Sequence, residues 1–232
     1  KNENKKNELS GLNILVTAGP TREPIDPVRF MSNYSSGKMG YAMAIAAKEL
    51  GANVELISGP VQIKAIPEIK TTFVETSKEM MNAVLKKVKY QNIFISVAAI
   101  ADYRPTNYSN KKHKKKEKSL NIEFQRGDDI LKTVSEKYNN IFTVGFAAET
   151  DHINNNALYK LKEKNLDIIV GNIANHEKKL GFESDYNEVV VFSKSKKIKI
   201  KKDRKLNIAL EIVSFMVDEY LKNVTVIKKD VK

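Results

Sequence analysis

The fold is decided by residues 13–58, in which NILVTA (13–18) and NVELIS (53–58) flank the alanine-rich run KMGYAMAIAAKEL (38–50). The two short runs are apolar and rich in β-branched residues, which is typical of buried strands. The run between them is typical of a helix, and Gly51 would end it. A strand, a helix and a second strand in this order predict two parallel strands joined by a right-handed crossover.

The same alternation continues along the chain and predicts an α/β, Rossmann-like three-layer fold with a mainly parallel sheet covered on both faces. The last segments predict a hairpin at the sheet edge and a C-terminal amphipathic helix. We expect the lysine-rich segment 103–118 to be a loop, and Ser77 to cap the helix that follows it. The expected strands are 72–75, 92–99, 120–124, 143–148, 167–171, 187–192 and 196–201, and the expected helices are 78–89, 129–137, 151–164 and 206–221.

Length and composition are those of one globular domain, with 232 residues of which 41% are apolar. We expect residues 1–10 to be a polar leader or linker and residues 11–232 to be a single domain. No apolar run is long enough for a membrane helix, the N-terminus has no apolar signal region, and cysteine is absent. We therefore expect a cytoplasmic protein that does not enter a membrane.

The net charge of +12 indicates polyanionic partners. Phosphorylated small molecules, lipid headgroups and nucleic acid all satisfy this charge. Ligands of parallel sheets bind beyond the carboxyl ends of the strands, so the loops at Ala18–Pro20 and Ala99–Asp102 are the first places to expect a site.

Ser35, Ser36, Gly37 and Lys38 stand where the first helix is expected to begin. Free backbone N–H groups, two hydroxyls and the helix dipole make an anion site, and Gly37 allows a phosphate to approach the backbone closely. A plain helix cap is the competing interpretation. The dinucleotide fingerprint G-x-G-x-x-G is absent, because Gly19 stands alone after the first strand.

The segment TAGPTREPIDPVRFMSNYSSGKMG (17–40) resembles the phosphopantothenoylcysteine synthetase family, in the form of the synthetase half of bifunctional bacterial coenzyme A enzymes. The resemblance spans nearly all of residues 12–192, in the family's order and spacing. It continues through SVAAIADYRP (96–105), KHKK (112–115), VGFAAET (144–150), KNLDIIVGN (164–172) and GFESDYNEV (181–189).

The resemblance implies a ligase that joins phosphopantothenate to cysteine through an acyl-nucleotide. It implies CTP as the nucleotide, because the resemblance is to the bacterial type, and Mg²⁺ bound with it. Arg29 and Asn33 match family residues near the reacting acyl group. Lys112 matches a lysine that reaches the triphosphate, with Lys111 or Lys114 as alternatives, because the lysine run can align one residue away.

The resemblance also implies a nucleotide site built from several segments. Phe146 would pack on the base, Lys160 and Lys164 would reach ribose or phosphate oxygens, and Ser35 to Gly37 would bind a phosphate. The competing interpretations are a core phenylalanine, a solvated helix face and, for Asp102, a turn residue. The nucleotide residues are Ala98, Ala99, Asp102, Lys112, Asp128, Asp129, Ile130, Leu131, Phe146, Lys160 and Lys164, with Asp128 where the family often has proline.

The expected partners are phosphopantothenate, cysteine, CTP and a second copy of the chain, as a homodimer or a dimer within a larger oligomer. The 103–118 loop or the late hairpin would reach the partner's site, and fusion to a phosphopantothenoylcysteine decarboxylase domain is possible in this family. The three histidines have no ligand-like spacing, so we expect no metal held by the protein alone. Two other functions stay open: a Rossmann-like nicotinamide-dependent reductase, and a nucleic-acid-binding domain, although the lysine run lacks interleaved arginine and aromatic residues.

Overall fold

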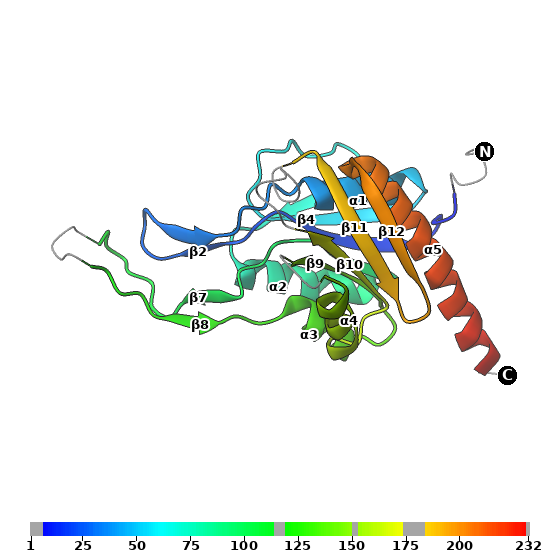
Figure 1. The fold of residues 1–232 in the computed structure, drawn as a ribbon. Helices are drawn as coiled ribbons and strands as arrows, with labels where there is room; N and C mark the ends of the chain where they lie inside the picture. Colours follow the sequence, from blue (N-terminus) through cyan, green and yellow to red (C-terminus); the bar gives the residue numbers. More distant parts are fainter. Residues whose placement is uncertain (1–6, 114–118, 150–152, 174–183, 231–232) are drawn as a thin grey trace.

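The computed structural model describes residues 7–113, 119–149, 153–173 and 184–230, and one eight-stranded sheet runs through it (Figure 1). The strand order is β12-β11-β10-β9-β6-β1-β4-β5. The six strands β10, β9, β6, β1, β4 and β5 pair in parallel with their neighbours. Strand β11 is antiparallel to β10, and β12 is antiparallel to β11. The strands are β1 (Asn13–Ala18), β4 (Asn53–Ser58), β5 (Lys70–Phe73), β6 (Ile93–Ser96), β9 (Phe142–Glu149), β10 (Ile168–Ile173), β11 (Tyr186–Ser193) and β12 (Lys197–Arg204).

Helices cover both faces of the sheet, as the strand and helix alternation predicts (Figure 1). One face is covered by α1 (Lys38–Glu49) and α5 (Lys205–Asp230), and the other by α2 (Ser77–Lys87), α3 (Ile130–Lys137) and α4 (Ile153–Glu163). Each face has its own apolar core. Alanines of α1, including Ala44 and Ala47, share a core with Ile208 and Val213 of α5, and their small size lets the two helices pack closely. The mainly parallel three-layer fold is confirmed.

Several boundaries differ from the sequence predictions. The third strand is Lys70–Phe73, not 72–75. Thr76, not Ser77, caps α2, because its hydroxyl accepts the N–H of Glu79 at 3.2 Å and Glu79 in turn accepts the N–H of Glu75 at 2.8 Å. The first bond satisfies an N–H group that the first turn of the helix leaves open, and the second fixes the chain just before the cap.

The N-terminal boundary also differs from the expected one. Leu9 is fully buried in the core under α1, and its N–H donates to the carbonyl of Leu50 at 3.0 Å. The packed body therefore includes Leu9, two residues earlier than expected.

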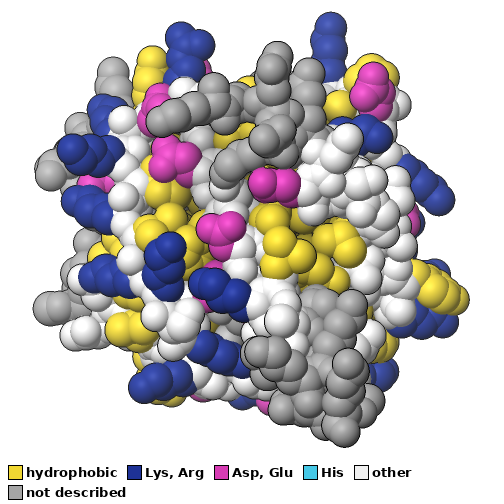
Figure 2. Space-filling model, turned by 90° about the vertical axis from the view of Figure 1, so that its right-hand side faces the viewer, with side chains coloured by type: hydrophobic (Ala, Val, Ile, Leu, Met, Phe, Trp, Pro, Cys, Tyr) yellow, Lys and Arg dark blue, Asp and Glu magenta, His cyan; other side chains and the backbone are white. Residues whose placement is uncertain are grey.

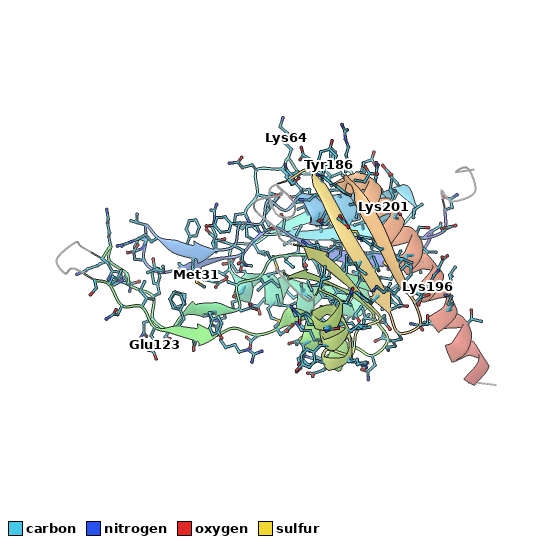
Figure 3. The ribbon with its side chains drawn as sticks, viewed as in Figure 1. Met31, Lys64, Glu123, Tyr186, Lys196 and Lys201 are labelled. Carbon is cyan, nitrogen blue, oxygen red and sulfur yellow. The ribbon has the colours of Figure 1, made fainter. Side chains whose placement is uncertain are left out.

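A projecting arm is the feature that sequence periodicity did not predict. We define the arm as residues 22–32, 103–113 and 119–126; Figure 3 labels Met31 and Glu123 on it. It contains two antiparallel pairs, β2 (Arg22–Pro24) with β3 (Phe30–Ser32), and β7 (Tyr103–Pro105) with β8 (Phe124–Arg126). The prediction of a loop over all of 103–118 and of a strand at 120–124 is therefore wrong. Pairing of Pro105 with Phe124 sets the register, so the strand begins only at Phe124.

Candidate functional site

The site lies where the loops after β1 and β6 meet, beyond the carboxyl ends of the parallel strands. Pro20 and Ala99 form a parallel bridge, and the N–H of Ala99 donates to the carbonyl of Gly19 at 2.9 Å. The Thr17 hydroxyl accepts the N–H of Ala98 at 3.3 Å. The two loops are thus fixed to each other by backbone bonds before any ligand is considered.

Two adjoining cavities open at this point, and we name them by the helix that begins at each. The α1 cavity has a volume of about 120 Å³ and the α3 cavity about 340 Å³. They share four wall residues, among them the half-buried Phe146. Lining residues of the α1 cavity include Gly19, Ser35, Ser36, Gly37, Lys38, Gly40, Asn172, Asn187 and Lys205.

The start of α1 has the geometry of an anion site rather than of a serine cap. Gly37 is the N-cap residue, with φ of 77°, and no side-chain cap bond forms there within the described part of the chain. A Cβ on Gly37 would lie 2.6 Å from Cγ1 of Val61, so only glycine fits. The N–H of Gly37 donates to Oγ of Ser35 at 3.3 Å, and Ser35 to Gly40 line the cavity, so the positive end of the helix dipole faces it.

The α3 cavity collects most of the residues that the family resemblance implies for the nucleotide. They come from the loop after β6, the start of α3, strand β9 and the end of α4. These residues are Ala98, Ala99, Asp102, Asp128, Asp129, Ile130, Leu131, Phe146, Lys160 and Lys164; Asn33, which the resemblance implies for the acyl group, lines the same cavity.

Asp129 organises one wall of the α3 cavity. Its carboxylate caps α3 by accepting the N–H of Lys132 at 3.0 Å, and it lies 2.6 Å from Nζ of Lys164. Burial acts to raise the pKa of Asp129, but the bond from Lys132 and the charge of Lys164 outweigh it, so the pKa is lowered. Lys164 is thus held by Asp129 at the cavity wall.

Asn33 and Asp102 are fixed on the other side of the α3 cavity. Nδ2 of Asn33 donates to the carbonyl of Ala99 at 2.9 Å, which holds the carboxamide beside the loop after β6. The carbonyl of Asp102 accepts the N–H of Gly127 at 2.8 Å and ties that loop to the segment before α3.

Arg29 and Lys112 lie on the arm, and within the described residues neither lines the α1 or the α3 cavity. The Arg29 guanidinium is 2.8 Å from the Asp26 carboxylate and donates to the carbonyl of His113 at 2.8 Å. Asp26 is buried and also accepts the N–H groups of Val28, Arg29 and His113. Burial acts to raise its pKa, but these bonds dominate and lower the pKa to about 2.

Of the two alternatives to Lys112, the structure describes only Lys111. Lys111 is exposed on the arm next to Lys112, and Lys114 lies outside the described residues. The structure thus groups Asn33 with the nucleotide residues and separates Arg29 and Lys112 from them.

No group of three or more acidic or histidine side chains that could hold a metal ion occurs in the described ranges. A Mg²⁺ ion bound mainly by phosphates and water needs only one or two carboxylates, and Asp102 at the α3 cavity fits that role.

None of the helices, over the residues the structure describes, is long and apolar enough to cross a membrane.

Three buried polar residues of the α1 cavity were missed by sequence reasoning. Asn172 is 9% exposed, Asn187 is 3% exposed and Lys205 is 6% exposed. The two asparagines stand inside IVGN and DYNEV, within segments that carry the family resemblance, so that resemblance held a signal for them. Lys205 begins α5, and no motif in the sequence marked it as a site residue.

Comparison with known proteins relates most of the chain to coenzyme A enzymes. The Coenzyme A biosynthesis bifunctional protein CoaBC of Haemophilus influenzae is 41% identical over 219 residues, which are 94% of this chain and 54% of that protein. The protein of the same name from Escherichia coli K12 is 46% identical over 190 residues, 80% of this chain and 47% of that protein. The chain spans about half the length of the curated relatives it matches.

Solved structures share the fold. A crystal structure of the C-terminal domain of CoaBC is 40% identical, has a TM-score of 0.77, and is matched over 91% of this chain and 96% of that one. A Cab2 mutant complexed with phosphopantothenate-cysteine is 16% identical, with a TM-score of 0.75 over 92% of this chain and 89% of that one, which shows the fold alone. The resemblance to the synthetase half of bifunctional coenzyme A proteins is thereby confirmed. A family model described as the DNA/pantothenate metabolism flavoprotein C-terminal domain matches residues 9–220, and the chain belongs to that family.

Proposed function

We propose that the chain is a phosphopantothenate–cysteine ligase of coenzyme A biosynthesis that forms an acyl-nucleotide from CTP. The observation that carries the proposal is the pair of adjoining cavities. One is lined by a helix start suited to a phosphate, and the other by the residues that the family resemblance implies for the nucleotide. The CoaBC relatives, at 41% and 46% identity, support the pathway.

The reaction divides into two steps. In the first, the phosphopantothenate carboxylate attacks the α-phosphorus of CTP, and pyrophosphate leaves with the electrons of the broken P–O bond. In the second, the cysteine amine attacks the acyl carbon and loses a proton, and CMP leaves. The absence of cysteine from the protein fits this scheme, because the cysteine is a substrate.

The cavity residues have distinct tasks in this scheme. The N–H groups at the start of α1 hold a phosphate, while Phe146 and the start of α3 hold the base. Asn33, fixed on Ala99, orients the acyl group for the amine. Asp102 would hold a Mg²⁺ ion that enters with the nucleotide, and the ion would offset phosphate charge.

We further propose a homodimer in which the arm of one protomer completes the site of the other. Large apolar side chains are exposed along the arm: Val28 60%, Phe30 48%, Tyr103 55%, Tyr108 50%, Leu120 47% and Phe124 39%. Such clustered exposure is typical of an interface. Arg29 and Lys112 lie on the same arm, so a partner's arm would bring both of them to the cavities.

The late hairpin is the weaker candidate for reaching the partner. Its edge strand β12 exposes Lys197, Lys199 and Lys201, and a row of lysines prevents edge-to-edge pairing of sheets. Figure 2 views the side of the molecule opposite the arm, and shows Lys and Arg side chains over much of that face with acidic and apolar side chains between them. The mixed character of this face also gives the nucleic-acid-binding alternative no support.

Pyrophosphate release tests the proposal. The protein is mixed with phosphopantothenate and either CTP or ATP, with and without cysteine, and products are identified by mass spectrometry. We expect pyrophosphate without cysteine, amide only with cysteine, and a preference for CTP. Absence of pyrophosphate with both nucleotides would overturn the ligase, and a fluorescence titration that detects NAD(P)H binding would then favour the reductase.

Asn33→Asp tests the division into two steps. We expect the variant to release pyrophosphate but to form about a hundredfold less amide, because a negative charge replaces the group that positions the acyl-nucleotide. Asn53→Asp is the matched control, because Asn53 is exposed at the amino end of β4, at the opposite end of the sheet. Full amide formation by Asn33→Asp would remove Asn33 from the mechanism.

A further inference from the structure

Lys205 is a buried lysine to which the mechanism above gives no task. It is the first residue of α5, is only 6% exposed and lines the α1 cavity. Lysine is rarely buried, because taking its charge out of water costs free energy unless something compensates. What the lysine faces therefore decides its role.

The surroundings of Lys205 are built from three elements. Its N–H donates to the carbonyl of Asp185 at 2.9 Å, and the Asp185 carboxylate lies 2.6 Å from Nζ of Lys38 at the start of α1. Lys38 and Lys205 also line a second groove of about 510 Å³, together with Tyr41 and Leu206.

Two lysines contribute to the lining of the α1 cavity. Lys38 and Lys205 both line it, and among its described lining residues there is no Asp or Glu. Asp185, the nearby acid, lines the groove instead. Two cations are thus brought together with the uncapped start of α1 and the buried amides of Asn172 and Asn187.

We infer that Lys205 is a phosphate-binding residue of the α1 cavity, where it meets from the side of α5 a phosphoryl group held at the start of α1. The identity of the phosphorylated ligand rests on the proposed function, and the phosphoryl group belongs to the nucleotide or to phosphopantothenate. Lys205 supplies a charge-assisted bond that the backbone N–H groups alone cannot supply.

The charges around Lys205 give the inference a pH dependence. Burial first, and then the charge of Lys38, lower its pKa to about 8, while Asp185 acts to raise it. Arg204 on β12 lines the groove beside it. Because the ordinary value is 10.5, the folded protein holds this proton less tightly than the unfolded chain, and this cost is present below pH 8 and is relieved as the pH rises toward 10.5.

A bound phosphoryl group reverses this balance, because a nearby anion favours the charged lysine. Binding should therefore take up a proton near pH 8 and weaken as the pH rises above 8.

Inorganic triphosphate is the probe, measured by isothermal titration calorimetry on the whole chain in two buffers of different ionisation enthalpy. We expect Lys205→Met to weaken triphosphate binding about tenfold or more and to abolish proton uptake, and Lys205→Arg to recover most of the affinity. Lys201→Met is the control, since it removes the same charge from an exposed position of β12 (Figure 3). Thermal unfolding without ligand establishes that each variant is folded. Wild-type affinity and proton uptake in Lys205→Met would overturn the inference.

Steady-state assays identify the source of the phosphoryl group. If Lys205→Met raises the KM for CTP alone, the phosphoryl group belongs to the nucleotide. If it raises the KM for phosphopantothenate alone, the group belongs to that substrate. If the wild-type protein forms no amide but its triphosphate binding needs Lys205, the proposed function fails and the inference stands. If it forms amide while Lys205→Met changes neither KM nor triphosphate affinity, the inference fails and the function stands.

Discussion

The body and the arm of this molecule are held together by different physics. In the body, central strands such as β6 and β9 lie between helices, and Ile95 and Val144 are fully buried. On the arm, Phe30 and Phe124 remain 48% and 39% exposed, and the fixed points are polar: the bonds to Asp26, and the N–H of Ser77 donating to the buried carboxylate of Glu23. The body thus has an apolar core on each face of the sheet, whereas the arm is held by polar bonds and leaves Phe30 and Phe124 partly exposed.

The proposed mechanism divides along the same line. In it the body contributes the cavities and Asn33, and the arm contributes Arg29 and Lys112. If the arm acts on a partner, a variant changed in the body and a variant changed in the arm should each lose activity alone. A mixture of the two variants should regain part of it.

Lys112→Gln is the change with the largest expected effect. We expect a loss of about a hundredfold or more in pyrophosphate release, because a positive charge is removed where triphosphate charge develops. The measurement is single-turnover release with phosphopantothenate and CTP. Lys111→Gln is the matched control, and the larger loss in that variant would move the assignment to Lys111.

Mixing Lys112→Gln with Asn33→Asp makes the comparison decisive. Neither variant alone should form amide efficiently. If arms cross between protomers, half of the randomly mixed dimers contain one intact site of two, so about a quarter of wild-type amide formation should return. No recovery despite confirmed subunit exchange would place the arm on its own protomer.

Phe124→Asp should weaken self-association by about tenfold or more, because it introduces a charge into the proposed apolar interface. Sedimentation velocity over a range of protein concentrations measures the change. Phe73→Asp is the matched control, since Phe73 is 62% exposed but lies on β5 at the edge of the body. Equal effects of the two substitutions would contradict an interface confined to the arm.

The smallest expected effect is a pH dependence of the arm's anchoring. The pKa of Asp26 is lowered from 3.8 to about 2, so its stabilising bonds are fully present above pH 4 and are lost as the pH falls toward 2. Amide exchange of Val28, Arg29 and His113, whose N–H groups donate to Asp26, should lose protection in that range before β1 does. Asp26→Asn should lower this protection at neutral pH, and unchanged exchange would contradict the anchoring role.

The sequence predicted the body far better than the arm, for a physical reason. Strands such as β1 and helices such as α1 are long enough for periodicity to emerge, and each faces a core whose pattern the chain records. The strands β2, β3, β7 and β8 have three residues each, too few for any period, and they exist only because of their pairing. Their register is set by contacts between segments that are distant in the sequence or joined by a loop, and the local sequence does not record it.

The site shows the same contrast. The residues that the resemblance implies for the nucleotide stand in contiguous motifs, and the structure brings all of them except Lys112 to the wall of the α3 cavity. Lys205 could not be predicted, because its burial arises only where the corner between β12 and α5 meets α1 and Asp185. An isolated lysine before an amphipathic helix has no local mark of this environment.

Phe146 forms part of the wall of both cavities, and this has a consequence for inhibitor design. A small acid that occupies the α1 cavity and a planar heterocycle that occupies the α3 cavity would lie on neighbouring surfaces of one ring. Joining two such fragments by a short tether would make the second binding event intramolecular, so the linked compound gains affinity through effective concentration without any new contact.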